Sequence, residues 1–456
     1  MHIALSRTLP LAAALLLAAQ GTWGKPSEAE IAKLGNELTC IGAEKAGNTD
    51  GSIPAFNGAW LGTPPGIQFA GVGTRHVDAY AAEKPLFTIT AQNMEEHAAR
   101  LSDGQKALLR KYPQTFAIPV YPSHRDFRFE DFRCELALKN ARVAELEDGN
   151  MGVQALKGAI PFPLPKTGDE LLRNMLLPAY VHEEDAVYDQ AVVYPDGRTA
   201  WGRMRMEILD QTSGPTDIGK PTTGMFAYSL TTILKPDRQK GEVMLAYTYF
   251  NEAKNPQTAW LYNPGTRRVR QSPGFGFDMP LGVGGFRTID DDRLFNGSPE
   301  RYDWKLVGKR ELYIPYNGYR LEAEGVKYAN LLKVGSIDPS VMRYEPHRVW
   351  VLEATLKPGY RHQYAKRVLY IDEDTWMAVM ADNYDAHGEL WRTNFINTFY
   401  AYGAKLFHTG VTVYHDLVSG AYLADRLTNE IDPPKLNGNR LQPFMYTTDM
   451  LRQVGR

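Results

Sequence analysis

A long run of alternating residues constrains the fold of this chain more than any other feature. The segment HRVWVLEATL, which ends at Leu356, places an apolar side chain at every second position from Trp350 onward. Similar runs follow it, separated by short turn sequences such as DED, DAHG and LVSG. Because successive side chains of a strand point to opposite faces, this pattern predicts an antiparallel meander of roughly five or more strands.

The two halves of the chain differ in pattern. Residues 25–168 contain short helical segments between Gly- and Pro-rich turns, and the first segment has Ser27 and Glu30 in capping-box spacing. From residue 169 to residue 456 the period shifts towards two. We therefore expect a helical and loop-rich N-terminal segment (25–168) that packs on an antiparallel sheet (169–456).

The first 24 residues have the pattern of a cleaved export signal. An apolar run from Leu9 to Ala19 follows a short basic start, and small residues surround Gly21 and Gly24. This run is much shorter than the roughly 20 apolar residues that span a bilayer, and no later segment approaches that length without charges. We expect a signal peptide over residues 1–24, cleaved near residues 21–24, and a soluble periplasmic protein that does not span the membrane.

Cys40 and Cys134 are the only two cysteines. In an oxidising compartment such a pair more often forms a disulfide than a metal or catalytic site. The bridge would close a loop long enough to contribute on the order of 4 kcal/mol to stability. The alternative is two buried free thiols.

The charge balance limits the classes of partner. With 51 basic and 53 acidic residues, the chain offers no overall field that attracts nucleic acid or an anionic membrane. Its 25 tyrosines and eight tryptophans are enough to fill a core and also to line a wide cavity. The chain must therefore recognise its partners through local contacts and not through its overall charge, and we expect no nucleic acid among these partners.

The sequence lacks the usual catalytic and metal-binding motifs. It has no G-x-S-x-G elbow, no H-E-x-x-H helix and no phosphate-binding loop. His347 lies two residues after Glu345, but neither this pair nor His362 has a third ligand at a recognisable spacing. The acidic residues 290–292 fit an exposed turn better than a calcium loop. We therefore predict no catalytic residue, no metal site and no cofactor.

The stretch YDWKLVGKRELYIPY combines aromatic and charged residues. Its alternation predicts a strand from about Trp304 to Tyr313, with the charges on the face opposite Leu306 and Leu312. The stretch is therefore interpreted as a wall of the sheet rather than as an active site.

Six ordered blocks resemble those of one known family: LTCIGAEKAGNTDGSIPAFNGAW, IPFPLPKTGDELLRN, AWLYNPGTRRVRQSP, DDDRLFNGSPERYDWKLVGKRELYIPYN, RYEPHRVWVLEATLKPGYRHQYAKRVLYIDEDTW and YDAHGELWR. The chain resembles a Gram-negative family of exported proteins of unknown function, commonly labelled outer-membrane lipoprotein-sorting proteins. The likeness spans essentially the whole mature chain.

The resemblance implies a mainly β fold with accessory helices (α+β). It would be a large open antiparallel half-barrel, similar to the periplasmic lipoprotein carriers of the Lol pathway, with helices over the concave face. The implied function is a carrier for hydrophobic, lipid-like molecules that works with an inner-membrane export pump of the resistance-nodulation-division type and an outer-membrane barrel protein. No catalytic residue is established for the family.

The residues themselves favour the same class of ligand, because an apolar cavity suits an acyl chain that needs no hydrogen bonds along its length. The residues predicted to line the cavity share one apolar register: Trp350, Leu352, Leu356, Leu369, Ile371, Met377 and Val379. The opposite register, with Val368, Tyr370, Trp376 and Met380, is also apolar, so the choice of face stays open. A periplasmic hydrolase or other enzyme acting on a lipid-like substrate is the alternative, since a triad assembled from distant residues leaves no motif.

We predict that Cys40 and Cys134 are disulfide-bonded in the exported protein. Labelling of thiols in the unfolded, unreduced protein should therefore detect none. Two reactive thiols per chain would contradict the pairing.

Overall fold

The computed structural model describes residues 24–272 and 277–455. The expected signal peptide, residues 1–24, lies outside this range except for Gly24. Six α-helices are described: α1 (Glu28–Ile31), α2 (Asp103–Lys111), α3 (Asp131–Val143), α4 (Gly168–Leu176), α5 (Tyr328–Leu331) and α6 (Thr448–Val454). The described 3-10 helices are η1 (Met94–Arg100), η2 (Asp237–Gln239), η3 (Val283–Gly285), η4 (Ile289–Leu294), η5 (Pro299–Arg301), η6 (Gly318–Glu322), η7 (Pro339–Val341) and η8 (Pro443–Met445).

Most described strands belong to one large sheet. The strands are β1 (Phe87–Ile89), β2 (Ile118–Val120), β3 (Glu145–Glu147), β4 (Gly152–Gln154), β5 (Glu183–Val193), β6 (Thr199–Asp210), β7 (Met225–Lys235), β8 (Val243–Tyr249), β9 (Thr258–Asn263), β10 (Arg268–Gln271), β11 (Pro280–Leu281), β12 (Arg287–Thr288), β13 (Tyr302–Pro315), β14 (Tyr344–Leu356), β15 (Lys366–Asp372), β16 (Ala378–Tyr384), β17 (Leu390–Ala401), β18 (Leu406–Asp416), β19 (Tyr422–Leu427) and β20 (Lys435–Leu436).

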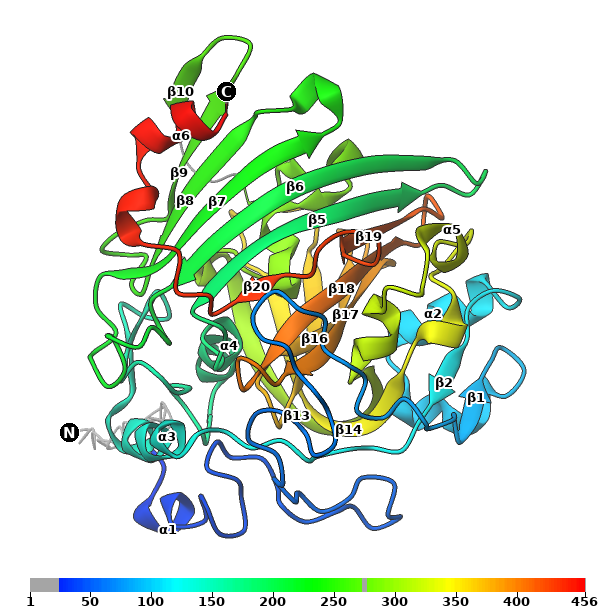
Figure 1. Cartoon of the computed structure of the whole chain (residues 1–456). Helices are drawn as coiled ribbons and strands as arrows, with labels where there is room; N and C mark the ends of the chain where they lie inside the picture. Colours follow the sequence, from blue (N-terminus) through cyan, green and yellow to red (C-terminus); the bar gives the residue numbers. More distant parts are fainter. Residues whose placement is uncertain (1–23, 273–276, 456) are drawn as a thin grey trace, which may run out of the picture.

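The large sheet has 16 described strands in the order β1-β2-β14-β15-β16-β17-β18-β19-β5-β6-β7-β8-β9-β10, with β13 beside β14 and β20 beside β5. Its neighbours are antiparallel except for β2 and β14. The path runs from β1 to β10 without closing on itself, which confirms the predicted mainly β fold with an open antiparallel sheet. In Figure 1 the long strands β5 to β8 sweep across the top, and the β13–β19 part lies below them.

Register divides the sheet into two faces. On the first face, here called the Leu352 face, one row of side chains crosses neighbouring strands: Leu306, Leu352, Leu369, Ala381, Asn394, Tyr414, Leu423, Val192 and Ala200. The row on the opposite face, here called the Val351 face, is Gly308, Val351, Tyr370, Met380, Phe395, Val413, Ala424, Ala191 and Trp201. Both rows are largely apolar, so both faces need a cover.

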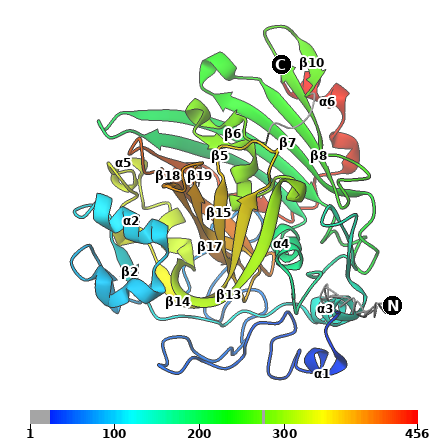
Figure 2. The same cartoon turned by 180° about the vertical axis from the view of Figure 1, so that it is seen from behind.

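Different parts of the chain cover the two faces. On the Val351 face α2 packs against β16 and β17. Gly104 approaches this face so closely that a Cβ atom there would lie 1.9 Å from the Thr393 hydroxyl oxygen, which explains the glycine. On the Leu352 face η3 packs against β5 and β6, and η4 packs against β16. In Figures 1 and 2, α2 and β2 lie on one side of the molecule, and α3 and α4 lie on the other.

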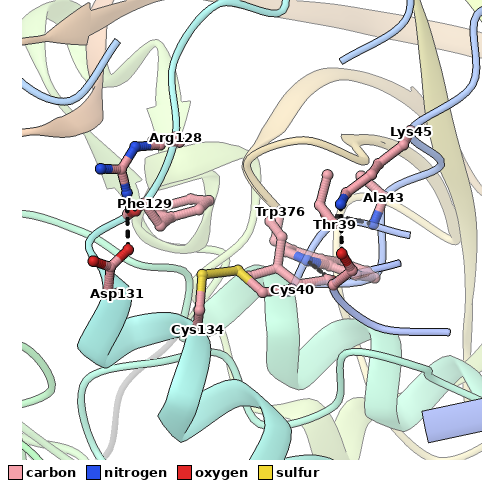
Figure 3. The surroundings of a disulfide bond; sticks show 11 residues. Thr39, Cys40, Ala43, Lys45, Arg128, Phe129, Asp131, Cys134 and Trp376 are labelled. Atoms are coloured by element: carbon pink, nitrogen blue, oxygen red, sulfur yellow. Dashed lines mark hydrogen bonds and ion pairs between the residues drawn. A yellow bond between two sulfur atoms is a disulfide. The ribbon is translucent and has the colours of Figure 1, made fainter. Parts of the chain in front are cut away.

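The predicted disulfide is present and joins two parts of the N-terminal segment, since Cys40 is bonded to Cys134 of α3. Figure 3 shows this bridge beside Trp376, whose indole Nε1 donates a hydrogen bond to the carbonyl oxygen of Ile41 at 3.0 Å. The predicted capping box of Ser27 and Glu30 is also present, at α1. The disulfide ties the segment around residue 40 to α3, and the hydrogen bond from Trp376 joins that segment to the turn between β15 and β16.

A β-bulge corrects one expectation. Strand β13 covers the predicted range, but its register shifts between Leu306 and Gly308. Leu306 lies opposite Leu352, whereas Leu312 lies opposite His347, on the other face. The two leucines therefore point to opposite faces, because an extra residue in a strand reverses the alternation that follows it.

Within the described residues, every helix is too short or too polar to cross a membrane.

Two buried histidines predict sensitivity to acid. Burial lowers the pKa of His408 and of His415 to about 3, from an ordinary value of 6.5. Between these pH values the unfolded chain binds more protons than the folded one, so stability falls as the pH falls from 6.5 towards 3. At pH 5 each histidine should cost ~2 kcal/mol of unfolding free energy.

We expect His415→Phe to reduce the loss of stability between pH 7.5 and pH 5, measured by chemical denaturation. The His415 ring packs against Phe116, Phe395 and Tyr422, which can accept an aromatic replacement. The exposed His387→Gln variant is the control and should lose stability as the wild type does. An unchanged pH dependence in His415→Phe would contradict this account.

Candidate functional site

The Leu352 face brings together most of the residues predicted to line a ligand cavity. Trp350 lies opposite Ile371, and Leu352 lies opposite Leu369, as the apolar register predicted. Leu352, Leu369 and Ile371 are fully buried in one hydrophobic cluster, against which Trp350 and Leu356 also pack. The register predicted for β14 and β15 is therefore present, and these side chains form part of a packed core.

The position of β16 differs from the expected one by a bulge. Its register shifts between Tyr370 and Ile371, so that Ala378 and Ala381 lie opposite Ile371 and Leu369. Met377 precedes the strand, and Val379 lies between the paired positions; both are buried. Trp376, which was assigned to the opposite register, lies in the turn and stacks on Trp350 with ring centroids 6.0 Å apart.

The same face continues into a more open region. Ala186 of β5 lies six residues from Val192 and therefore points to the same face. It begins a second row of side chains across neighbouring strands: Ala186, Met206, Thr231, Met244 and Leu261. Met206 is buried, Met244 is half-buried, and Leu261 at the end of the row is 44% exposed. The apolar face is thus sealed at β14 and β15 and becomes accessible towards β8 and β9.

A polar row borders the apolar one. From Ala354 it continues through the polar residues Arg367, Asn383, Arg392 and Asp416 on neighbouring strands. Arg367 is fully buried, and its Nη2 lies 2.6 Å from Asp290 Oδ2 of η4. Although burial opposes ionisation, Arg367 and His362 lower the pKa of Asp290 below its usual range. This ion pair fixes η4 over the Leu352 face.

The acidic residues 290–292 are therefore not the exposed turn that the sequence indicated. Asp290 and Asp291 are buried, and both form ion pairs with Arg367. The sequence could not show this, because their partner lies 76 and 77 residues away in the chain, on β15.

Two amides on this face lack partners. Asn394 lies in the apolar row between Ala381 and Tyr414, and Asn383 lies two residues from Ala381 on the same strand face. Both side chains are fully buried, and no hydrogen bond reaches the nitrogen or the oxygen of either amide. A buried polar group without a partner costs ~1–3 kcal/mol, so these amides are suited to bind a polar group between apolar walls.

Sequence motifs do not identify these asparagines as site residues. Their only signal in the sequence is that an asparagine stands inside each of the strand segments AVMADNY and LWRTNFINTFY, which contain many apolar residues. That signal also fits ordinary satisfied asparagines, which hydrogen-bond to a neighbouring strand.

Two cavities among the described residues are small. One lies between Phe116, Tyr344, Phe395 and Val413 on the Val351 face, and its volume is about 10 Å³. Another, lined by Ala155, Leu177, Thr212 and Phe250, is of the same size. Each holds about one water molecule, so an acyl chain enters neither without a rearrangement.

Comparison with known proteins gives a family and a close relative. The family described as "Protein of unknown function (DUF1329)" matches residues 88–452. An uncharacterized protein of Pseudomonas aeruginosa is 39% identical over 454 residues, which cover 97% of this chain and 97% of the relative. Neither description assigns an activity or a ligand.

Three solved structures are similar to this chain at low sequence identity. A DUF1329 family protein from Desulfovibrio piger has a TM-score of 0.43 at 16% identity, covering 62% of this chain and 97% of that one. A putative outer membrane lipoprotein-sorting protein domain from Vibrio parahaemolyticus has a TM-score of 0.40 at 15% identity, covering 59% and 91%. A LolA superfamily protein from Nitrosomonas europaea has a TM-score of 0.37 at 14% identity, covering 63% and 100%.

We predict that Leu352→Glu destabilises the protein by more than ~4 kcal/mol, because it buries an unpaired charge in the packed face. Val307→Glu is the matched control, since Val307 lies on the adjacent strand β13 and is 53% exposed. It should change stability by no more than ~0.5 kcal/mol. Chemical denaturation of both variants tests this, and equal stability would mean that Leu352 faces water rather than a closed core.

Proposed function

Because the chain belongs to the DUF1329 family of proteins of unknown function, we propose its function from its own surfaces: it binds hydrophobic, lipid-like molecules and carries them in the periplasm. The ligand in this proposal has an apolar chain and a polar group that accepts or donates hydrogen bonds. Its binding surface is the Leu352 face of the large sheet.

One observation carries the proposal: two unpartnered amides lie on the Leu352 face, Asn394 within its apolar row and Asn383 in the adjoining polar row. Asn383 and Asn394 offer two carbonyl oxygens and two NH₂ groups, none of which has a hydrogen-bond partner. Ligand sites of proteins combine apolar walls with a few such polar groups. A carboxyl or ester group of a lipid would satisfy the amides while its chain lies along the apolar row.

The accessible end of the Leu352 face, towards β8 and β9, supports entry of the ligand at that end. Met204, Met206 and Met244 lie on this face of β6 and β8, and the small side chains Ala227, Ala246 and Ala259 lie on the same face of β7, β8 and β9. Methionine side chains are flexible and polarizable, so they adapt to apolar ligands of different shape. We propose that the apolar chain first contacts this region.

The residues predicted from the sequence would line the deeper part of the site: Trp350, Leu352, Leu356, Leu369, Ile371, Met377 and Val379. Most of them are buried in the closed arrangement, so ligand entry requires η4 and its neighbours to move away from the sheet. The ion pair of Arg367 with Asp290 holds that cover and would have to rearrange.

The partners expected from the sequence resemblance belong to the same proposal. The protein would exchange its cargo with an inner-membrane export pump of the resistance-nodulation-division type and with an outer-membrane barrel protein. The sequence pattern of the export signal supports the periplasmic location.

The test is binding of a fluorescent fatty acid to the wild type and to the double variant Asn383→Leu/Asn394→Leu. Leucine has a similar volume and removes both unpartnered amides, so the variant should be at least as stable as the wild type. We expect its affinity for the fatty acid to fall by about tenfold or more, which corresponds to ~1.4 kcal/mol.

Asn330→Leu, at an exposed position of α5, is the control and should bind as the wild type does. Wild-type affinity in the folded double variant would exclude the two amides from the site. Failure of the wild type to bind any apolar probe would contradict the carrier function itself.

A further inference from the structure

A second cluster of buried ionisable groups lies where β14 begins and where β15 turns into β16. His347 Nδ1 lies 3.8 Å from Asp372 Oδ1 and 3.9 Å from Asp374 Oδ2. One such atom from each of the three residues lies within 4.8 Å of the others. All three side chains are at most 2% exposed. Three potential metal ligands therefore converge inside the protein.

The contacts of Glu345 fix the orientation of the imidazole. His347 Nε2 lies 3.3 Å from Glu345 Oε2. Glu345 also accepts hydrogen bonds from Arg343 Nε at 2.5 Å, from Asn317 Nδ2 at 3.0 Å and from the backbone N–H of His124 at 2.8 Å. A carboxylate surrounded by donors is an acceptor, so the His347 proton belongs on Nε2. In the neutral imidazole, the lone pair of Nδ1 then points towards Asp372 and Asp374.

A proton between these atoms does not account for the spacing. A hydrogen bond from an imidazole N–H to a carboxylate spans ~2.7–3.2 Å, which is well below the observed 3.8 and 3.9 Å. Two ligands of a tetrahedral zinc ion, each at ~2.0–2.2 Å from the metal, lie ~3.3–3.6 Å apart. The spacing therefore fits a bound cation better than a shared proton.

The neighbouring cations are already paired. Arg125 donates from Nε and Nη2 to the two oxygens of Asp374, at 2.7 and 2.8 Å. Lys309 and Arg348 both pair with Glu373. Each carboxylate oxygen of Asp374 keeps a second lone pair, so its pairing with Arg125 is compatible with metal binding.

Asp372 is the exception among these carboxylates. Its Oδ2 accepts hydrogen bonds from Thr375 Oγ1 at 2.7 Å and from the Tyr316 hydroxyl at 3.4 Å. Its Oδ1 has no hydrogen-bond partner, although the residue is fully buried. A cation bound beside Asp372 Oδ1 would give this buried oxygen the partner that it lacks.

We propose that His347 Nδ1, Asp372 Oδ1 and Asp374 Oδ2 bind one divalent cation of the zinc class. An imidazole nitrogen combined with two carboxylate oxygens is a ligand set that suits zinc. Glu345 acts as the positioning residue that orients the imidazole, as carboxylates do beside metal-bound histidines. Because the ligands are sealed from solvent, the ion is structural and enters during folding.

The ion would tie the β15–β16 turn to the start of β14. The same turn carries Trp376, which the disulfide-bonded segment around Cys40 covers. The sequence around His347 and Glu345 shows no third ligand, because Asp372 and Asp374 come from the end of β15 and the turn after it, about 25 residues later. The inference does not depend on the carrier function.

The experiment is refolding in the presence and absence of zinc. The wild type, with its disulfide intact, is unfolded in guanidinium with EDTA and refolded with either ZnCl₂ or EDTA. Zinc at exposed sites is then removed by a brief EDTA wash, and the metal content is measured by inductively coupled plasma mass spectrometry. We expect about one zinc per chain after refolding with ZnCl₂, and a melting temperature at least ~5 °C above that of the EDTA-refolded protein.

Two variants locate the ion. Asp372→Asn and His347→Gln keep side chains of similar size, and the glutamine retains an amide donor for Glu345. Both should hold at least about tenfold less zinc than the wild type after the same wash. His362→Gln is the matched control, because His362 also contacts a buried aspartate, Asp290, but that aspartate is already paired with Arg367. It should retain zinc as the wild type does.

Less than about one zinc per ten wild-type chains, with equal melting temperatures in zinc and EDTA, would overturn the proposal. Full zinc content in folded Asp372→Asn and His347→Gln would also overturn it, because the ion would then lie elsewhere. If neither variant folds, the two wild-type refolding conditions decide the question on their own.

Discussion

An open β-sheet must cover two apolar faces, and this constraint determines how the rest of the chain is arranged. Each 100 Å² of apolar surface left in water costs ~2.5 kcal/mol, and the large sheet carries apolar rows on both faces. A closed barrel would cover one face with its own strands, but here the path of strands ends at β1 and β10. Helix α2 covers part of the Val351 face, η3 and η4 cover part of the Leu352 face, and α6 packs against β8, β9 and β10.

Several of the buried charges hold these covering segments on the sheet. The Leu352 face meets η4 through Arg367 and Asp290, and the β15–β16 turn meets the N-terminal segment through Arg125, Asp374 and Trp376. Buried ion pairs contribute little net stability compared with apolar packing, but they fix one arrangement because breaking them is expensive. Such a covering segment is held over the apolar face by only a few polar contacts. A ligand can therefore displace it, provided that the ligand replaces its apolar contacts with the sheet.

Local patterns of the sequence predicted a large part of the fold. Alternation identified the strands, and it correctly placed Trp350 and Leu352 opposite Ile371 and Leu369. The capping box at Ser27 and the Cys40–Cys134 pair were also predicted correctly. The bulges after Leu306 and Tyr370 were missed, because an inserted residue changes the register without leaving a pattern in one sequence. The contacts of Asp290 with Arg367 and of His347 with Asp372 were missed for a different reason: they join segments whose proximity depends on the whole sheet.

The central claim is that the Leu352 face, with Asn383 and Asn394, receives a lipid-like molecule. Native mass spectrometry of the protein purified gently from cells tests it most directly, because a bound ligand appears as an added mass and is identified after release. The account predicts a fraction of chains with one apolar ligand that carries a hydrogen-bonding group, and loss of that added mass when both asparagines are replaced by leucine. A wild-type spectrum of bare chains only, unchanged after incubation with extracted membrane lipids, would contradict it.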